Sequence, residues 1–230
     1  MASVLAWAST TRTASSGQKD KQVTPAELRG LYAITDETLI PESVFVATVE
    51  QALRGGAAIV QYRDKSGNEA KRLEQASALR SLCGEYNACL IINDDIRLAK
   101  AAEAHGVHLG EEDVSIEQAR LMLGDSAIIG VSCYNQLQRA IEAQAAGADY
   151  VALGAVFTSP TKPDARSASC ELIREAKSQL EIPVCAIGGI DKSNVAQVIG
   201  SGADMAALIS GLFSAADIAV TAKYISGLFD

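Results

Sequence analysis

Short apolar runs alternate with longer amphipathic stretches from Leu28 to the end of the chain. The longer stretches repeat their apolar residues every three or four positions, which is the period of a helix that buries one face. The short runs have the length of buried strands. The pattern therefore predicts helices between eight strands, which we expect at residues 31–35, 58–62, 89–93, 106–110, 127–131, 150–154, 183–187 and 205–209.

The joints between these elements also repeat. The segments GGAAIV, AHGVHL, AGADYVAL and SGADMAAL each place a glycine at a helix end just before a strand. Each strand and its helix take about 25 residues, a length typical of βα units. Eight such units favour an α/β fold with a closed parallel (β/α)8 barrel, a TIM barrel, over an open doubly wound sheet, in which the number of strands is free.

The composition indicates a globular protein. The 230 residues carry a formal net charge of -8 and the sequence pI is about 4.9, whereas a nucleic-acid-binding protein normally shows a broad basic surface. Because no run of about eighteen apolar residues occurs, we expect no transmembrane helix. The cysteines lack paired spacing, which favours buried core residues in a reducing compartment over a disulfide or zinc framework at Cys83, Cys89, Cys133, Cys170 and Cys185.

The first 27 residues differ from the rest of the chain. They are rich in serine, threonine, alanine, lysine and arginine and contain no acidic residue before Asp20. This composition is typical of a disordered extension and also of an organelle transit peptide, but it lacks the apolar core of a secretory signal. We expect residues 1–27 to be disordered and residues 28–230 to form one barrel domain in the cytoplasm, with organelle import as the alternative.

Polar residues follow the second predicted strand at alternate positions. The segment QYRDK projects Gln61, Arg63 and Lys65 to the same side, because alternate residues of a strand share a face. Taken alone, such a segment is most simply a strand end that frays into a solvated loop. In a barrel, however, the carboxyl ends of all strands form one rim where binding residues gather, which makes these side chains candidates for a polyanion site.

Two aspartates follow the third and fourth strands on the same rim. Asp94 comes directly after one strand, and Asp113 comes a few residues after the next. Either one alone is also typical of a helix N-cap. Together, beside Arg63 and Lys65, they suit Mg²⁺ bridging a pyrophosphate, because Mg²⁺ takes one or two carboxylates and leaves its other positions to water and substrate.

The remaining strand ends add hydroxyls, a third cation and glycines. A glycine pair follows strand seven; alone it marks only a turn, but many barrels hold a phosphate on backbone N–H groups after strands seven and eight. The segment TSPTK after strand six is either a solvated turn or a wall of the same site. The candidates in these loops are Ser132, Ser159, Thr161, Lys162, Gly188, Gly189, Ile209 and Ser210.

The two histidines are expected to be structural. His105 and His108 are three residues apart across a joint between a helix and a strand, rather than on one helix face. This placement favours a structural role over a metal site.

Eight motifs resemble those of one known family. LYAITD, QYRDK, IIND, HGVHLGEED, IGVS, GADYVALGAVFTSPTK, AIGGI and ALIS stand in the order, and at about the spacing, of the thiamine-phosphate synthase family, over residues 30–212. The resemblance implies a (β/α)8 barrel that joins hydroxymethylpyrimidine diphosphate to hydroxyethylthiazole phosphate, or its carboxylated form, giving thiamine monophosphate and pyrophosphate. We expect a Mg²⁺-assisted, dissociative displacement that requires no side-chain nucleophile or general base.

The resemblance also implies roles for the candidate residues. Asp94 and Asp113 would bind Mg²⁺, and Ser132 would hydrogen-bond the leaving pyrophosphate. The residues that would bind the pyrimidine diphosphate are Gln61, Arg63, Lys65, Asn93 and Lys162. The residues that would bind the thiazole phosphate, by side chain or backbone, are Ser159, Thr161, Gly188, Gly189, Ile209 and Ser210. The residues expected to act in catalysis are Arg63, Lys65, Ser132 and Lys162.

Three positions depart from the family pattern. The chain has Asp95 where an arginine is usual, Glu111 where glutamine is usual, and Ser159 where threonine is usual. Serine keeps the hydroxyl, so that change costs little. Asp95 adds negative charge beside the expected metal site, and Arg97 two residues later is the candidate for compensating it.

Two alternatives stay open. A related thiazole tautomerase shares the barrel but uses a histidine shortly after strand five, where this chain has Tyr134. A non-catalytic barrel that binds a phosphate ligand would not need both carboxylates together with three cations. We expect small-molecule substrates as partners, without nucleic acid or membrane, and a homo-oligomer is compatible with the sequence.

Overall fold

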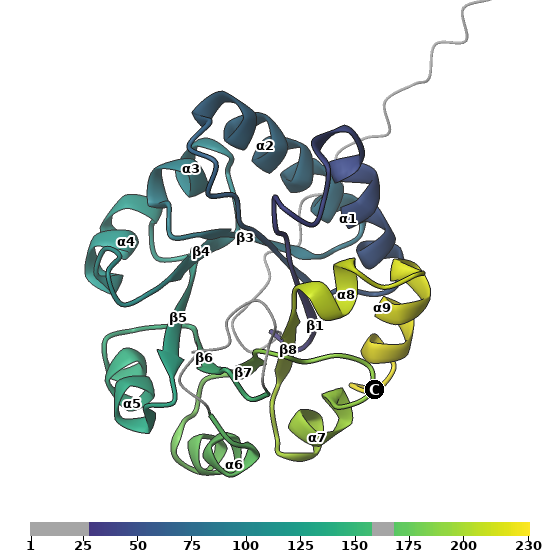
Figure 1. Cartoon of the computed structure of the whole chain (residues 1–230). Helices are drawn as coiled ribbons and strands as arrows, with labels where there is room; N and C mark the ends of the chain where they lie inside the picture. The colour runs from purple at the N-terminus through teal and green to yellow at the C-terminus, as the bar shows by residue number, and fades with distance from the viewer. Residues whose placement is uncertain (1–27, 158–167) are drawn as a thin grey trace, which may run out of the picture.

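Eight parallel strands close into a barrel, and helices surround it (Figure 1). The computed structural model describes residues 28–157 and 168–230. Neighbouring strands pair in the order of the sequence, and β1 closes the barrel by pairing with β8. The strands are β1 (Gly30–Ile34), β2 (Ile59–Tyr62), β3 (Cys89–Asn93), β4 (Gly106–Leu109), β5 (Ile128–Tyr134), β6 (Tyr150–Gly154), β7 (Val184–Ile187) and β8 (Met205–Leu208).

Helices follow the strands around the outside of the barrel. Several begin at the polar caps that the sequence provides: Asn68 caps α2, and Ser115 forms a capping box with Gln118 at the start of α4. The helices of the described residues are η2 (Glu42–Val44), α1 (Phe45–Arg54), α2 (Glu69–Glu85), α3 (Ile96–Ala101), α4 (Ile116–Leu123), α5 (Leu137–Ala145), α6 (Cys170–Gln179), α7 (Val195–Gly200), α8 (Ser210–Phe213) and α9 (Ile218–Ser226).

The predicted (β/α)8 barrel is therefore confirmed, and the open sheet is excluded. Each of the eight expected strands is present near its expected position. The largest difference is in β5, which we expected to end at residue 131 but which continues to Tyr134. Its pairing with β6 shifts register between Ser132 and Tyr134, a bulge that keeps the extra residues in the strand. Ser132 is thus part of β5.

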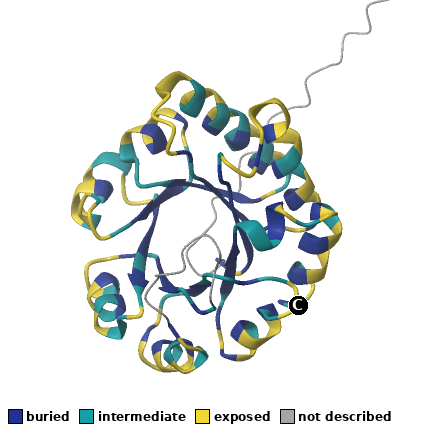
Figure 2. Cartoon of the chain, viewed as in Figure 1, coloured by how far each residue is buried: buried dark blue, intermediate teal, exposed yellow. Residues whose placement is uncertain are grey.

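The strand residues alternate between two cores. Inward-facing side chains such as Tyr32, Ile59 and Ile91 fill the barrel, and outward-facing ones such as Val60 pack under the helices. Figure 2 shows the strands mostly buried, with exposed residues on the outer sides of the helices. Gln61 lies two residues after Ile59, so it faces inward as well.

Glycines make room inside the barrel. A Cβ on Gly130 of β5 would lie 2.0 Å from Cζ of Tyr150. Only glycine leaves that space for the Tyr150 ring, which reaches the centre of the barrel and stacks at 5.5 Å on the His108 ring.

The cysteines do not form disulfides. Cys83, Cys89, Cys133 and Cys185 are buried, as expected, whereas Cys170 at the start of α6 is only partly buried. Within residues 28–157 and 168–230, no helix combines the length and apolar character needed to cross a membrane.

Candidate active site at the carboxyl rim of the barrel

The segment QYRDK leaves β2 with its side chains divided between the barrel and the helices. Gln61 is 3% exposed, and its Nε2 donates a hydrogen bond to Tyr32 Oη at 2.7 Å inside the barrel. Tyr62 points the other way and donates to Gln75 of α2 at 3.0 Å. Asp64 also faces α2, where it forms an ion pair with Lys71. Tyr62 and Asp64 therefore point away from the rim, towards α2.

Arg63 is held at the end of β1. Its backbone N–H donates to Thr35 Oγ1 at 2.9 Å, and its Nη1 lies 3.1 Å from Asp36 Oδ2 and 3.9 Å from Glu37 Oε2. Burial alone would raise the pKa of Asp36, but hydrogen bonds from Thr38 and the charge of Arg63 lower it overall. The guanidinium is therefore paired and oriented on the rim. Sequence reasoning missed Asp36 and Glu37, although two acids directly after the first strand were a usable signal.

Lys65, Asp94 and Asp113 meet beside Arg63. Lys65 Nζ lies 3.0 Å from Asp94 Oδ2. Asp94 has φ 63°, and its N–H donates to His108 O at 2.8 Å, which turns the residue out of β3 towards the loop after β4. In that loop Asp113 Oδ2 accepts the Gly110 N–H at 2.6 Å.

Asp94 affects the ionisation of Asp113. Burial raises the pKa of Asp113, and a hydrogen bond and like charge from Asp94 raise it further, against the lowering effect of the Gly110 N–H. Neither residue is a helix N-cap, because Asp95 caps α3 and Ser115 caps α4. Two carboxylates close enough for Asp94 to raise the pKa of Asp113 are a suitable donor set for a divalent cation.

The donor chemistry fits Mg²⁺ better than a softer metal. Among the described residues, no group of three or more histidines, cysteines, aspartates and glutamates could hold a metal. Zinc usually takes three or four such protein ligands, whereas Mg²⁺ takes one or two carboxylates. Asp94 and Asp113 therefore fit the ion that the sequence predicts.

The unusual Asp95 is neutralised by a residue that we did not expect. Its Oδ2 lies 3.0 Å from Arg72 Nη2 of α2, and its Oδ1 accepts the backbone N–H groups at the start of α3. Arg97 contributes only its backbone N–H to Asp95, so the expectation that its charge compensates was wrong. Asp95 thus caps its own helix with one carboxylate oxygen and pairs with the preceding helix through the other.

Glu111 lies at the edge of the site and contacts α5. Its Oε1 is 3.9 Å from Arg139 Nη1, and Arg139 Nε donates to Ser132 O at 2.9 Å. The arginine also lies over the Tyr134 ring, 5.9 Å from its centroid. The glutamate therefore faces a cation that holds the end of β5.

Ser132 is connected to the opposite side of the barrel through buried polar groups. Its Oγ lies 2.9 Å from His108 Nε2, and His108 Nδ1 lies 2.9 Å from Tyr150 Oη. Tyr150 Oη in turn lies 2.8 Å from Tyr32 Oη, which accepts from Gln61. Burial lowers the pKa of His108 to about 4, so its imidazole is neutral.

His105 makes a structural contact, as expected. His105 Nδ1 accepts the Leu90 N–H at 2.8 Å, which ties the start of β4 to β3. His108 was expected only to be structural, and its contacts with Ser132 and Tyr150 were missed. The available signal was that tyrosine and histidine occupy inward positions in LYAIT, GVHLG and YVALG, where apolar residues are the rule.

The ends of β7 and β8 contribute backbone rather than charge. Gly188 and Gly189 have φ of 100° and 62°, and Asn194 Nδ2 donates to Gly189 O at 2.8 Å. A Cβ on Gly211 of α8 would lie 2.1 Å from Ile190 O. The short helix α8, whose first residue is Ser210, therefore packs directly against the loop after β7, the arrangement in which barrels often bind phosphate.

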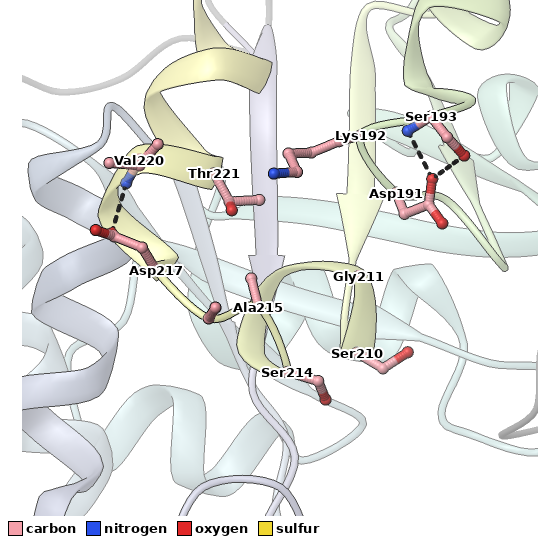
Figure 3. A pocket seen from close by; sticks show the side chains of 11 residues that line it. Asp191, Lys192, Ser193, Ser210, Gly211, Ser214, Ala215, Asp217, Val220 and Thr221 are labelled. Atoms are coloured by element: carbon pink, nitrogen blue, oxygen red, sulfur yellow. Dashed lines mark hydrogen bonds between the residues drawn. The ribbon is translucent and has the colours of Figure 1, made fainter.

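A cavity of about 520 Å³ lies outside these glycines, between the loop after β7 and the starts of α8 and α9 (Figure 3). Of the predicted site residues that the structure describes, only Ser210 is in its lining, and the side chain of Lys192 extends into the space between the elements. Because Gly188, Gly189 and Ile209 do not line it, this cavity adjoins the predicted phosphate site rather than forming it.

Comparisons with known proteins agree on one family. A family model described as thiamine monophosphate synthase matches residues 31–212. The thiamine-phosphate synthase of Thioalkalivibrio sulfidiphilus is 50% identical over 207 residues, covering 90% of this chain and 98% of the relative. The thiamine-phosphate synthase of Methylococcus capsulatus is 49% identical over 211 residues, covering 92% of this chain and 94% of that protein. The chain belongs to the thiamine-phosphate synthase family.

A solved thiamine-phosphate synthase relative supports the same fold. The thiamine phosphate pyrophosphorylase from Pyrococcus furiosus superposes with a TM-score of 0.80 at 38% identity, covering 88% of this chain and 96% of that chain. The predicted activity is confirmed at this level: the chain is an enzyme of thiamine biosynthesis, a transferase that makes thiamine phosphate. The tautomerase and the non-catalytic barrel are therefore set aside.

The structure describes some of the remaining predicted site residues of this synthase but not all of them. Asn93 ends β3 opposite His108, at an inward position with Ile91. Ile209 precedes α8 at the end of β8. Ser159, Thr161 and Lys162 lie outside the described residues, so their contribution stays a prediction.

Proposed function

We propose that this synthase binds its two phosphorylated substrates on opposite halves of the rim. The pyrimidine diphosphate would lie over β2 to β5, where Arg63 and Lys65 stand beside two carboxylates. The thiazole phosphate would lie at the ends of β7 and β8, on backbone groups beside α8. The observation that carries the proposal is the meeting of Lys65, Asp94 and Asp113 at one point of the rim.

Asp94 and Asp113 would hold one Mg²⁺ ion. Bound there, it would supply positive charge to the diphosphate oxygens and offset the repulsion between the two carboxylates. Asp94 is at present paired with Lys65, so the ammonium can move from the carboxylate to the diphosphate when both ligands are bound. Lys65 is well suited to this exchange, because its side chain is 56% exposed and flexible.

The residues of the charged half would act on the leaving group. As the bond from the pyrimidine methylene carbon to the diphosphate oxygen lengthens, negative charge grows on the departing pyrophosphate. Arg63 and Lys65 would stabilise that charge, and Ser132 would donate a hydrogen bond to it. Gln61 and Asn93 face the barrel interior and would orient the pyrimidine ring. Lys162 is the third cation expected from the sequence.

The thiazole nitrogen would then attack the electron-deficient methylene carbon. The chain needs only to aim the nitrogen, since positioning alone provides a large part of the rate in such reactions. Gly188, Gly189, Ile209 and Ser210 would fix the phosphate end of the thiazole through backbone groups, together with Ser159 and Thr161 as predicted from the sequence.

An assay of pyrophosphate release tests this function. The purified chain is incubated with hydroxymethylpyrimidine diphosphate and hydroxyethylthiazole phosphate, with Mg²⁺ or with a chelator. We expect release of one pyrophosphate for each thiamine monophosphate formed, and loss of the activity with the chelator. Full activity in the chelator would overturn the metal assignment, and absence of thiamine monophosphate with Mg²⁺ present would overturn the function.

A further inference from the structure

A chain of hydrogen bonds crosses the barrel from Gln61 to Ser132. It runs from Gln61 Nε2 to Tyr32 Oη at 2.7 Å and from Tyr32 to Tyr150 Oη at 2.8 Å. It continues to His108 Nδ1 at 2.9 Å and from His108 Nε2 to Ser132 Oγ at 2.9 Å. The five residues come from β2, β1, β6, β4 and β5, and those between the two ends are buried, with Tyr32 and Tyr150 both 1% exposed.

The chemistry of these groups gives the chain a direction. Because the Gln61 N–H donates to Tyr32, the Tyr32 hydroxyl is free to donate its own hydrogen to Tyr150, its other partner in the chain. In that arrangement the Tyr150 hydrogen is directed to His108 Nδ1. A neutral imidazole that accepts at Nδ1 carries its proton on Nε2.

The direction decides what Ser132 can offer to a ligand. With the proton on Nε2, His108 donates to Ser132 Oγ, and the serine keeps its hydroxyl hydrogen for another acceptor. If the chain ran the other way, Ser132 would donate to His108 and would present only lone pairs. A diphosphate has only acceptor oxygens, so it is attracted in the first case and repelled in the second.

We propose that Tyr32, Tyr150 and His108 are positioning residues that keep Ser132 oriented as a hydrogen-bond donor towards the diphosphate. The inference rests on the proposed role of Ser132 at the leaving group. It explains why three polar side chains are buried in the barrel. The fold itself does not require them, because inward positions of small barrels are normally filled by apolar residues. Gly130 supports this arrangement by leaving the space that the Tyr150 ring occupies.

The chain offers a matched pair of variants. Tyr150→Phe removes the hydroxyl that links Tyr32 to His108 and keeps the ring. Tyr62→Phe removes a hydroxyl from an equally buried tyrosine, but that hydroxyl bonds to Gln75 of α2 outside the barrel. A merely structural role predicts similar behaviour of the two variants, whereas the proposed role predicts that only Tyr150→Phe affects the reaction.

The histidine tautomer provides a readout that does not depend on activity. The chain contains two histidines, so a protein labelled with ¹⁵N-histidine gives two imidazole signals in the NMR spectrum. His105 is the internal reference, because its Nδ1 accepts the Leu90 N–H and neither variant removes that contact. In the wild-type protein we expect His108 to carry its proton on Nε2.

In Tyr150→Phe the donor to His108 Nδ1 is lost, so the Nε2–H tautomer is no longer enforced, and we expect a fraction of His108 with its proton on Nδ1 to appear while His105 is unchanged. We also expect kcat for pyrophosphate release to fall about tenfold or more, since a misdirected donor loses part of its effect on the transition state, with KM for the thiazole phosphate within about twofold. Tyr62→Phe should keep both the tautomer and kcat.

Three results would each overturn the proposal. A wild-type His108 that is protonated on Nδ1, or on both nitrogens, would do so without any variant, even if Tyr150→Phe did not fold. A fall in kcat without a change of tautomer, or a change of tautomer without a fall in kcat, would also contradict it. Pyrophosphate release by the wild-type protein is measured first, so failure of the proposed function is recognised separately.

Discussion

The two halves of the rim are prepared for phosphate groups in different ways. Over β1 to β4, charged side chains stand in pairs: Arg63 with Asp36, and Lys65 with Asp94. The ends of β7 and β8 lead into glycines and the short helix α8. Lys192 is a nearby cation, but it lines the adjoining cavity. One half therefore depends on the identity of side chains and the other on the path of the backbone.

This difference indicates how each half can be broken. Removing one charge should disable the charged half while leaving the fold intact, because its side chains lie on the surface of the rim. Adding one methyl group should disable the backbone half, because its segments approach too closely for a Cβ. The two kinds of change should also affect different kinetic constants, since leaving-group stabilisation determines kcat and phosphate capture determines KM.

The largest effect is expected for Asp94→Asn. Asparagine tolerates the positive φ of this position, so the backbone is preserved while the charge is lost. We expect kcat/KM for pyrophosphate release to fall about 100-fold or more, because the metal loses one of its two carboxylates. Asp125→Asn, on the surface loop after α4, is the control and should keep wild-type rates. Normal turnover of Asp94→Asn would remove this residue from the site.

A smaller effect is expected for Lys65→Ala. The variant loses one cation at the diphosphate but keeps Arg63, so kcat should fall by about ten to 100-fold. Lys192→Ala tests the other half of the comparison and should change kcat by less than about twofold, because that half acts through backbone groups. Steady-state kinetics at fixed Mg²⁺ measures both. Equal losses in the two variants would contradict the division of the rim.

Gly211→Ala should weaken the backbone half. The added methyl group would collide with Ile190 O and push α8 away from the loop after β7. We expect KM for the thiazole phosphate to rise about tenfold, because the N–H groups at the start of α8 are displaced. Gly200→Ala at the end of α7 is the matched control, because a Cβ there meets nothing within 4 Å. Unchanged KM in Gly211→Ala would separate α8 from substrate binding.

Asp64→Asn should change stability without changing catalysis. The Asp64 side chain is 2% exposed and lies 2.5 Å from Lys71 Nζ, on the side of the segment that faces α2. We expect the free energy of unfolding at neutral pH to fall by about 1–3 kcal/mol, with kcat unchanged. Denaturant unfolding and the pyrophosphate assay test this together. A loss of activity in the folded variant would place Asp64 in the site.

The same variant has a defined pH dependence. Burial alone would raise the pKa of Asp64, but hydrogen bonds from Lys71 and Ser66 lower it below its usual 3.8. A carboxyl with a lowered pKa stabilises the fold above that value, and the contribution is lost as the pH falls through the folded pKa. The stability difference between wild type and Asp64→Asn should therefore be constant near neutral pH and shrink below about pH 4.

The sequence was sufficient for the fold and for much of the rim. Periodicity located all eight strands, and the alternation in QYRDK predicted that Gln61, Arg63 and Lys65 share one side, because local backbone geometry determines which way a strand residue points. The proximity of Lys65, Asp94 and Asp113 followed from the barrel, in which the ends of neighbouring strands meet.

Contacts that cross the barrel could not be predicted in the same way. The connection from Tyr32 through Tyr150 to His108 joins strands that are distant in sequence, and it depends on the reach of side chains and on the space at Gly130. The pairing of Asp95 with Arg72 rather than with Arg97 depends on how α2 packs beside α3. Such contacts are set by packing, for which the hydrophobic pattern contains no direct signal.

The most direct test measures initial rates of pyrophosphate release over a grid of Mg²⁺ and thiazole phosphate concentrations. Wild type, Asp94→Asn and Gly211→Ala are compared side by side. The two-part rim predicts that Asp94→Asn alters the Mg²⁺ dependence and kcat and leaves KM for the thiazole phosphate unchanged. It predicts that Gly211→Ala raises KM for the thiazole phosphate and leaves the Mg²⁺ dependence and kcat unchanged. A single variant that shifts both the Mg²⁺ dependence and the thiazole phosphate KM would contradict the separation of the two halves.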